Sequence, residues 1–369
     1  MEPLFDDLAD ASPPYSSWSF FGADDRRGTI NLLTPARVAA AAKLIRTGEQ
    51  LGLDYAVNAF EPYPTGTRPP TQHHVFANNE FHRDDWLDSF YLQSTSQLDS
   101  LRHIGHPAHG FYNGQSPDSS ELGIHRWADT GIAGRGVLLD VAGYFAAAGR
   151  GPLSAAGGRR PLSAAGGPEP LPAAGGPEPL PAAGGRELDA PFSAAAGSDY
   201  DCETTVTLEA ALLDEIAAHQ GVTFDGGDLL LLHTGWAANY VAKTPEERVE
   251  FNTRNRSPGL AQRTSTLRWL WDHEIALVAS DTPAVEADPV GESDFRGPAD
   301  RPPDRGVDHS GMLHRPLIAL LGMAMGELWK LDELAARCAA TGRYDFFLTC
   351  KPLNIPGGVG SPPNAIAFM

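Results

Sequence analysis

The sequence contains few cysteines and no long apolar run. Its three cysteines, at positions 202, 338 and 350, are too few and too widely spaced for a disulfide framework or a zinc knuckle. The longest apolar runs, such as residues 317–325, fall short of the ~18 residues that a membrane span requires. The chain starts with an acidic segment where a signal peptide would be basic. Together these absences predict a soluble, cytoplasmic protein.

Basic residues are also scarce. The chain has 369 residues, with 28 Lys and Arg against 47 Asp and Glu, which gives a net charge of −19 when histidine is neutral. Nucleic acids and anionic membranes both bind basic surfaces. We therefore expect neither of them as a partner, and a small molecule as the substrate.

Several common catalytic motifs are missing. There is no Gly-x-Ser-x-Gly elbow, which argues against a serine hydrolase of the α/β-hydrolase type. No phosphate-binding Gly-Lys loop and no His-Glu-x-x-His zinc motif occur, and residues 134–136 lack the third glycine of a dinucleotide fingerprint. Any chemistry must come from another arrangement of residues.

Glycine and proline, by contrast, are abundant, and many of them lie in one repeat. A seven-residue element, Pro-Leu-Ser/Pro-Ala-Ala-Gly-Gly, begins at Pro152, Pro161, Pro170 and Pro179, a period of nine residues. Each copy offers only one leucine to a core, and the period is too short for a solenoid repeat. We interpret residues 151–190 as a flexible low-complexity insertion, and residues 1–369 as a single domain that carries it.

The flanking sequence alternates between strand and helix patterns. Short apolar runs bounded by glycine or polar residues predict buried strands near residues 137–141, 229–232, 276–279 and 346–348. Cap and stop residues predict three helices. The first follows Thr34-Pro35 over residues 36–46 and stops at Gly48, the second runs from Thr207 to Gly221, and the third covers residues 332–340. Interleaved strands and helices are typical of the α/β class.

Histidine is concentrated close to an aspartate. His103, His106 and His109 follow Asp99 in a segment rich in glycine and proline. A strand at residues 97–99 would direct Gln97 and Asp99 to one face. A turn after this strand could then bring His103 back to Asp99. A carboxylate beside an imidazole suits a metal site or an acid–base pair, although histidines in such a loop are more often ordinary surface residues.

The segment from Gln93 to His103 resembles the His-x-Gly-Thr-His-x-Asp-x-Pro-x-His signature of the cyclase superfamily, which includes bacterial kynurenine formamidase and isatin hydrolase. Asp99 and His103 match the signature, whereas Gln93 and Gln97 stand at the positions of its two early histidines. Further matching blocks, in the family order, lie at residues 18–33, 134–140, 227–236, 280–283, 314–328 and 352–362. The resemblance is to the longer members and covers the chain except for about residues 148–198.

The resemblance implies a set of site residues. Metal ligands would be Asp99, His314 and Glu327, with Gln97 as a possible fourth, and His103 with Asp99 would transfer protons. The cofactor implied by the resemblance is one divalent ion, Mn²⁺ or Zn²⁺. Gln93 and Gln97 depart from the signature here, because an amide oxygen is a weaker ligand than imidazole and suits harder ions such as Mn²⁺ or Mg²⁺. Candidate substrate contacts are the side chains of Gln93, His106, His109, Tyr112 and His74.

The resemblance also implies a fold and an activity. The fold would be a layered β/α domain with a mixed, barrel-like central sheet, assembled as a homodimer or homotetramer. The activity would be that of an arylformamidase-like amidohydrolase, which acts on C–N bonds other than peptide bonds in a small cyclic or N-acyl amide, or on a lactone. Two alternatives stay open: a metal-independent cyclase or lyase acting next to a carbonyl, as in polyketide ring closure, and a non-catalytic small-molecule binder.

Overall fold

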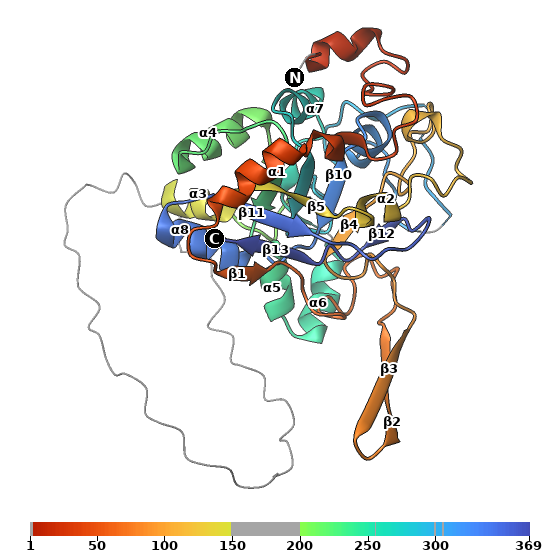
Figure 1. Cartoon of the computed structure of the whole chain (residues 1–369), viewed down its shortest axis with the longest axis vertical. Coiled ribbons are helices and arrows are strands. Elements are labelled where there is room, and N and C mark those ends of the chain that lie inside the picture. Colours follow the sequence, from red (N-terminus) through yellow and green to blue (C-terminus); the bar gives the residue numbers. More distant parts are fainter. Residues whose placement is uncertain (1–2, 149–199, 255, 299, 305) are drawn as a thin grey trace, which may run out of the picture.

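The computed structural model describes residues 3–148, 200–254, 256–298, 300–304 and 306–369. The predicted insertion at residues 151–190 lies outside the described residues. The central feature of the described part is one mixed sheet of nine strands (Figure 1). In spatial order, its strands are β1 (Gln50–Gly52), β13 (Ala365–Phe368), β11 (Asp345–Cys350), β5 (Ile132–Asp140), β7 (Leu229–His233), β9 (Leu277–Ser280), β10 (Ala324–Glu327), β4 (Gln97–Asp99) and β12 (Gly360–Ser361).

The middle of the sheet is parallel and its two sides are antiparallel. Strands β5, β7, β9 and β10 run parallel to one another, and each outer strand pairs antiparallel with its neighbour. Every residue of Leu229–His233 is buried, as expected for a strand covered on both faces. The sheet curls into a half-barrel, which confirms the predicted α/β fold with a mixed, barrel-like sheet.

Helices flank this sheet on both sides (Figure 1). They are α1 (Pro35–Ala41), α2 (His125–Ala128), α3 (Val141–Ala148), α4 (Ala210–Gln220), α5 (Trp236–Ala242), α6 (Pro245–Asn252), α7 (Thr264–Asp272) and α8 (Asp332–Thr341). Shorter helical turns are η1 (Phe5–Asp10), η2 (Gly28–Leu32), η3 (Ala42–Leu44), η4 (Tyr112–Gly114) and η5 (Arg315–Leu320). Over the described ranges, no helix combines the length and the apolar character that crossing a membrane requires.

The predicted helix boundaries differ from the structure at two ends. The helix predicted to run to Arg46 ends at Ala41, and a short 3-10 turn follows it over Ala42–Leu44. The Thr34 hydroxyl accepts a hydrogen bond from the Arg37 backbone N–H and caps α1, and Gly221 ends α4 in the left-handed conformation with φ of 68°. The predicted start of α4 at Thr207 is wrong. Residues Thr207–Leu208 instead form strand β6, which pairs in parallel with β8 (Gly259–Leu260), so the helix begins three residues later.

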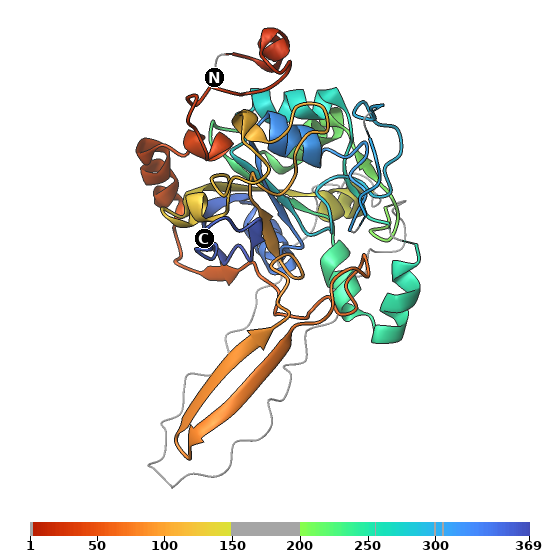
Figure 2. The same cartoon turned by 90° about the vertical axis from the view of Figure 1, so that its right-hand side faces the viewer.

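One hairpin projects away from the rest of the described structure. Strands β2 (Gln72–Asn79) and β3 (His82–Asp88) pair antiparallel, and Figures 1 and 2 show both extending beyond the sheet and its helices. His74 lies on this hairpin, where its ring stacks on Trp86 at a centroid distance of 4.8 Å. The two chain segments that connect this hairpin to the sheet carry Arg68 and Gln93, which matter for the site described below.

A buried histidine joins two of the central elements. His233, at the end of β7, lies with Nδ1 2.8 Å from Asp140 Oδ1 and Nε2 3.3 Å from Asp332 Oδ1. Burial alone would lower the pKa of His233, but the two carboxylates raise it well above its usual 6.5. The imidazolium therefore stabilises the fold fully below pH 6.5, and this contribution is lost as the pH rises through the higher folded-state pKa.

We predict that His233→Asn lowers the free energy of unfolding by about 3 kcal/mol at pH 6, because a buried carboxylate loses its charged partner. The deficit relative to the wild type shrinks at alkaline pH, where wild-type His233 is neutral as well. Urea unfolding at several pH values measures both effects, with the exposed His82→Asn as control. A deficit that does not change with pH would show that His233 stabilises the fold without its charge.

Candidate active site

Two paired strands bring three polar side chains together at one end of the sheet. In the antiparallel pair of β10 with β4, Glu327 lies opposite Gln97 and Met325 lies opposite Asp99. Because side chains two residues apart point to the same face, Gln97 and Asp99 share the face that Glu327 occupies. Asp99 is fully buried, and only 3% of Glu327 is exposed. Burial raises the pKa of Glu327 to about 7, although His314 opposes this rise.

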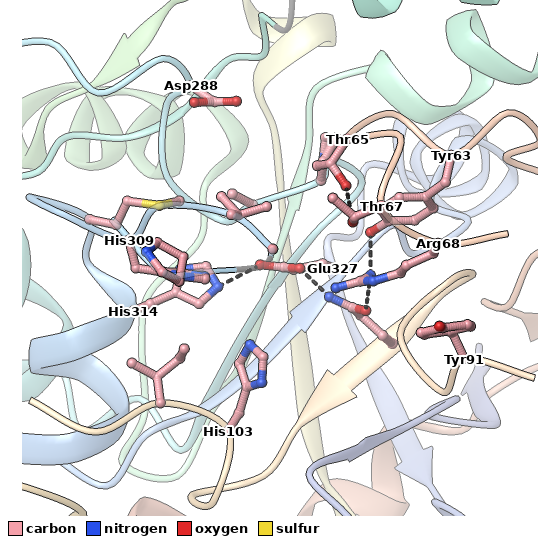
Figure 3. Close-up of a pocket in the computed structure, with 18 residues that line it drawn as sticks. Tyr63, Thr65, Thr67, Arg68, Tyr91, His103, Asp288, His309, His314 and Glu327 are labelled. Carbon is pink, nitrogen blue, oxygen red and sulfur yellow. Dashed lines mark hydrogen bonds and ion pairs between the residues drawn. The ribbon is translucent and has the colours of Figure 1, made fainter. Parts of the chain in front are cut away.

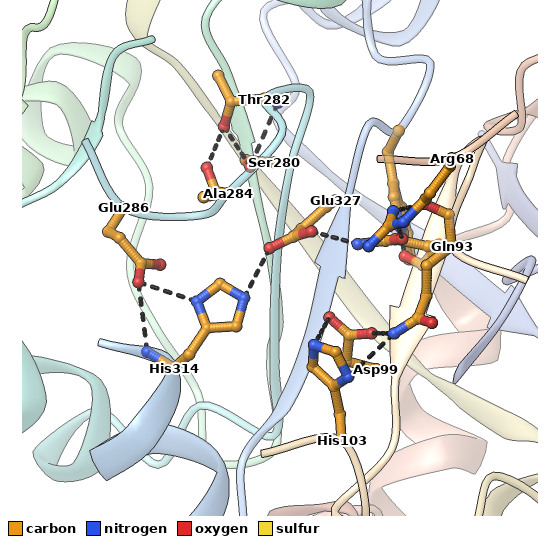
Figure 4. Close-up of polar contacts among 12 residues, drawn as sticks. Arg68, Gln93, Asp99, His103, Ser280, Thr282, Ala284, Glu286, His314 and Glu327 are labelled. Carbon is orange, nitrogen blue, oxygen red and sulfur yellow. Dashed lines mark hydrogen bonds and ion pairs between the residues drawn. The ribbon is translucent and has the colours of Figure 1, made fainter. Parts of the chain in front are cut away.

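His314 reaches the same place from the start of the π-helical turn η5. Its Nε2 lies 3.0 Å from Glu327 Oε1, and its Nδ1 lies 2.9 Å from Glu286 Oε1 (Figure 4). Burial lowers the pKa of His314, but the two carboxylates outweigh burial and raise it well above 6.5. Glu286 thus fixes the orientation of the imidazole and leaves Nε2 directed at Glu327, as a carboxylate does behind a metal-binding histidine.

One carboxylate oxygen of this cluster, Asp99 Oδ2, is buried without a hydrogen-bond partner among the described residues. Glu327 Oε1, also buried, pairs among those residues only with His314 Nε2, at 3.0 Å. Buried carboxylate oxygens carry a large desolvation cost unless a donor or a cation offsets it. One candidate ligand atom from each of Asp99, His314 and Glu327 lies within 4.8 Å of the others. These three residues therefore fit a divalent ion, for which imidazole and carboxylate are suitable ligands.

His103 lies beside this set, in the turn that follows β4. Its Nε2 is 4.0 Å from Asp99 Oδ2, and Gln93 Nε2 is 3.0 Å from His103 Nδ1 and 2.8 Å from Asp99 Oδ1 (Figure 4). One amide group thus fixes the imidazole relative to the carboxylate. Burial lowers the pKa of His103 below 6.5, against the opposing effect of Asp99. A neutral imidazole can accept a proton at neutral pH.

The two glutamines differ from the roles expected for them. Gln97 was predicted as an oxygen ligand, but its Nε2 donates to Glu327 Oε2 and its Oε1 accepts from Arg68 Nη1 at 3.4 Å. Gln93 was predicted as a substrate contact, but its amide is engaged with Asp99 and His103. Where the family signature has two histidines, this chain has amide donors that hold the carboxylates in place.

A second group of possible ligands shares His314. Ligand atoms of His103, His309 and His314 also lie within 4.8 Å of one another. The ring centroids of His309 and His314 are 5.0 Å apart. Burial, together with the neighbouring His314 and His103, lowers the pKa of His309 to about 2, so its nitrogen lone pairs stay available to an ion.

These residues border a cavity of about 780 Å³. Figure 3 shows Glu327 between two groups, with His309 and His314 on one side and Tyr63 and Arg68 on the other. Apolar side chains complete much of the wall, namely Ile104, Pro283, Ala284, Pro303, Val307 and Met312. The volume is in the range of small-molecule sites.

Four predicted substrate contacts lie outside this cavity. His106 and His109 stack on each other at a centroid distance of 4.7 Å in the loop beyond His103, and His109 is exposed. Tyr112 is fully buried and donates its hydroxyl to Asp25 Oδ2 at 3.1 Å, so it supports the packing of η4. His74 lies on the projecting hairpin. None of the four is among the residues that line the cavity.

Sequence reasoning missed three residues that belong to the site. His309 stands five residues before His314, and the repeated histidine in this segment was an available signal. Glu286 and Arg68 carried no such signal. They lie far along the chain from the signature, and only the fold brings them beside His314 and Gln97.

Comparison with known proteins agrees with the predicted family. The sequence model of the family described as putative cyclase matches residues 188–287. The crystal structure of a novel cyclase is 27% identical, with a TM-score of 0.66, over 96% of this chain and 99% of that one. A search of curated proteins gives no match.

Two further solved structures share the fold at low identity. Isatin hydrolase A from Ralstonia solanacearum is 14% identical with a TM-score of 0.51, over 90% of this chain and 97% of that one. An isatin hydrolase bound to the product analogue thioisatinate is also 14% identical, with a TM-score of 0.50, over 90% and 95%. The family match and the cyclase structure both liken this chain to the cyclase superfamily, and the isatin hydrolase structures show that it shares their fold.

Proposed function

We propose that the protein is a hydrolase of a small cyclic or N-acyl amide, or of a lactone. The observation that carries the proposal is the buried cluster of Asp99, His314 and Glu327, whose ligand atoms lie within 4.8 Å of one another, beside the neutral His103 at a cavity of substrate size. Such a cluster suits a cation, and the histidine supplies a base next to it. The isatin hydrolase structures, which show only the fold, are consistent with this class of reaction.

Asp99, His314 and Glu327 would hold one divalent ion, Mn²⁺ or Zn²⁺. When bound, such an ion acidifies water and polarises a carbonyl group. The two carboxylates would offset the charge of the ion, and Glu286 holds the His314 ring with Nε2 directed at Glu327. His309 would lie close enough to replace or supplement one of these ligands.

His103 would move the proton. It is neutral at pH 7 because burial lowers its pKa, so it can accept a proton from the attacking water and return it to the leaving nitrogen. Gln93 Nε2 donates to Asp99 Oδ1 and lies 3.0 Å from His103 Nδ1, so the same amide would hold Nδ1 as an acceptor and place the ring hydrogen on Nε2. Gln93 would therefore select the tautomer of His103.

One observation favours a second candidate function. Gln93 and Gln97 already donate hydrogen bonds to Asp99 and Glu327, which leaves each carboxylate partly satisfied without an ion. A metal-independent cyclase or lyase could use His103 with Asp99 to remove a proton next to a carbonyl.

Isotope labelling separates the two reactions. We predict that the full-length protein hydrolyses at least one member of a panel of isatin, N-formylkynurenine and simple lactones. In H₂¹⁸O, mass spectrometry should then find one labelled oxygen in the product of a single turnover. A product without label would favour the cyclase or lyase, and no turnover of any amide or lactone would favour a binder.

A further inference from the structure

Arg68 offers the cavity a positive charge that the hydrolytic residues do not use. It lies in the segment that leads into the hairpin and lines the cavity with Tyr63 and Gln97 (Figure 3). Its guanidinium lies over the Tyr63 ring, 4.5 Å from the centroid. Its Nη1 donates to the Tyr63 hydroxyl at 2.6 Å, to the backbone oxygen of Gln93, and to Gln97 Oε1. A single nitrogen therefore anchors the side chain.

The other two nitrogens of Arg68 remain available. Nη2 and Nε form no hydrogen bond or ion pair with the described residues, and neither is a buried atom that lacks a partner. The side chain is half-buried and lines this cavity as well as a smaller one of about 140 Å³ next to Pro69, so these N–H groups are within reach of solvent. Gln97 lies between Arg68 and Glu327 and bonds to both, which keeps the guanidinium from pairing with that carboxylate.

A guanidinium with two adjacent free N–H groups matches the two oxygens of a carboxylate. We propose that Arg68 binds a carboxylate group of the substrate. The apolar wall that includes Ile104, Val307 and Met312, together with the ring of Tyr91, would hold an apolar or aromatic body. This inference rests on the proposed function only in taking the cavity as the substrate site. It narrows the substrate to an amide or lactone that also carries a carboxylate.

The test compares two fluorescent probes of nearly equal shape, 2-aminobenzoate and its neutral counterpart 2-aminobenzamide. Fluorescence titration of the full-length protein should give a Kd for the carboxylate about tenfold or more below that for the amide, because charge-assisted hydrogen bonds distinguish the two. Arg68→Met should remove this preference while the Kd for the amide stays within about threefold. Arg68→Lys keeps the positive charge but not the pair of adjacent N–H groups, so it should retain part of the preference for the carboxylate. The exposed Arg254→Met serves as the matched control.

The same titration on Glu327→Gln separates this proposal from the proposed function. If a metal ion rather than Arg68 binds the carboxylate, the preference disappears in Glu327→Gln, and the proposal is overturned. If the preference survives there and is lost in Arg68→Met, the proposal stands even when no hydrolysis is found. Three other results would also overturn the proposal. They are equal affinities of the wild type for the two probes, no binding of 2-aminobenzoate, and loss of binding of both probes in Arg68→Met. The last result would show that Arg68 only supports the cavity wall.

Discussion

His103→Ala should reduce turnover by about 100- to 10,000-fold, the range expected when a general acid–base group is removed. The side chain is 18% exposed and reaches the cavity, and its lowered pKa keeps it neutral at pH 7. Its removal should leave the bound metal in place, because Asp99, His314 and Glu327 remain. Steady-state kinetics on the best substrate of the panel, with metal analysis of the same sample, measure both quantities.

The matched control for this prediction is His109→Ala. His109 comes from the same histidine-rich segment but is exposed and lies outside the cavity, so its loss should leave turnover unchanged. Unchanged turnover in His103→Ala would contradict the assignment of His103. Loss of the metal together with turnover would instead make His103 a ligand, with His309 and His314 as the other members of the set.

Glu327→Gln should weaken divalent metal binding by about 100-fold or more, because it replaces a charged ligand with a neutral amide that binds such ions poorly. Glu327 is buried, with only 3% of it exposed, and its Oε1 lies 3.0 Å from His314 Nε2. Equilibrium dialysis against Mn²⁺ and Zn²⁺, followed by elemental analysis, gives the affinities of the wild type and the variant.

Glu292→Gln is the control for that measurement, because Glu292 is exposed and pairs with Arg263. It should bind metal as the wild type does. Equal metal affinity in Glu327→Gln and the wild type would move the site to the three histidines, which share only His314 with the proposed set.

The sequence predicted those parts of the fold that depend on local patterns. Apolar runs bounded by glycine or polar residues predicted β5, β7, β9 and β11. The cap at Thr34 predicted the start of α1, and Gly342 predicted the end of α8. The start of α4 was not predictable, because Thr207–Leu208 pairs with a strand some fifty residues later. The use of Thr207 as a strand residue is a tertiary effect that a local cap signal cannot reveal.

In the candidate active site, too, only the features that depend on local sequence were predictable. The strand at Gln97–Asp99 and the turn that returns His103 follow from sequence spacing, and the structure places both as expected. The amide orientations of Gln93 and Gln97 depend on Glu327 and Arg68, which other segments contribute. Tyr112 was predicted at the cavity because of its nearness in sequence, yet it is directed into the core.

The metal content of the full-length wild-type protein shows most directly whether Asp99, His314 and Glu327 form a metal site. Samples purified without chelators, and samples dialysed against Mn²⁺ or Zn²⁺, would be analysed for metal per chain. We predict about one equivalent of one of these ions per chain, retained on gel filtration and required for hydrolysis of the panel substrates. A protein that binds neither ion, or that turns over its substrate equally well after the metal is removed, would contradict this prediction.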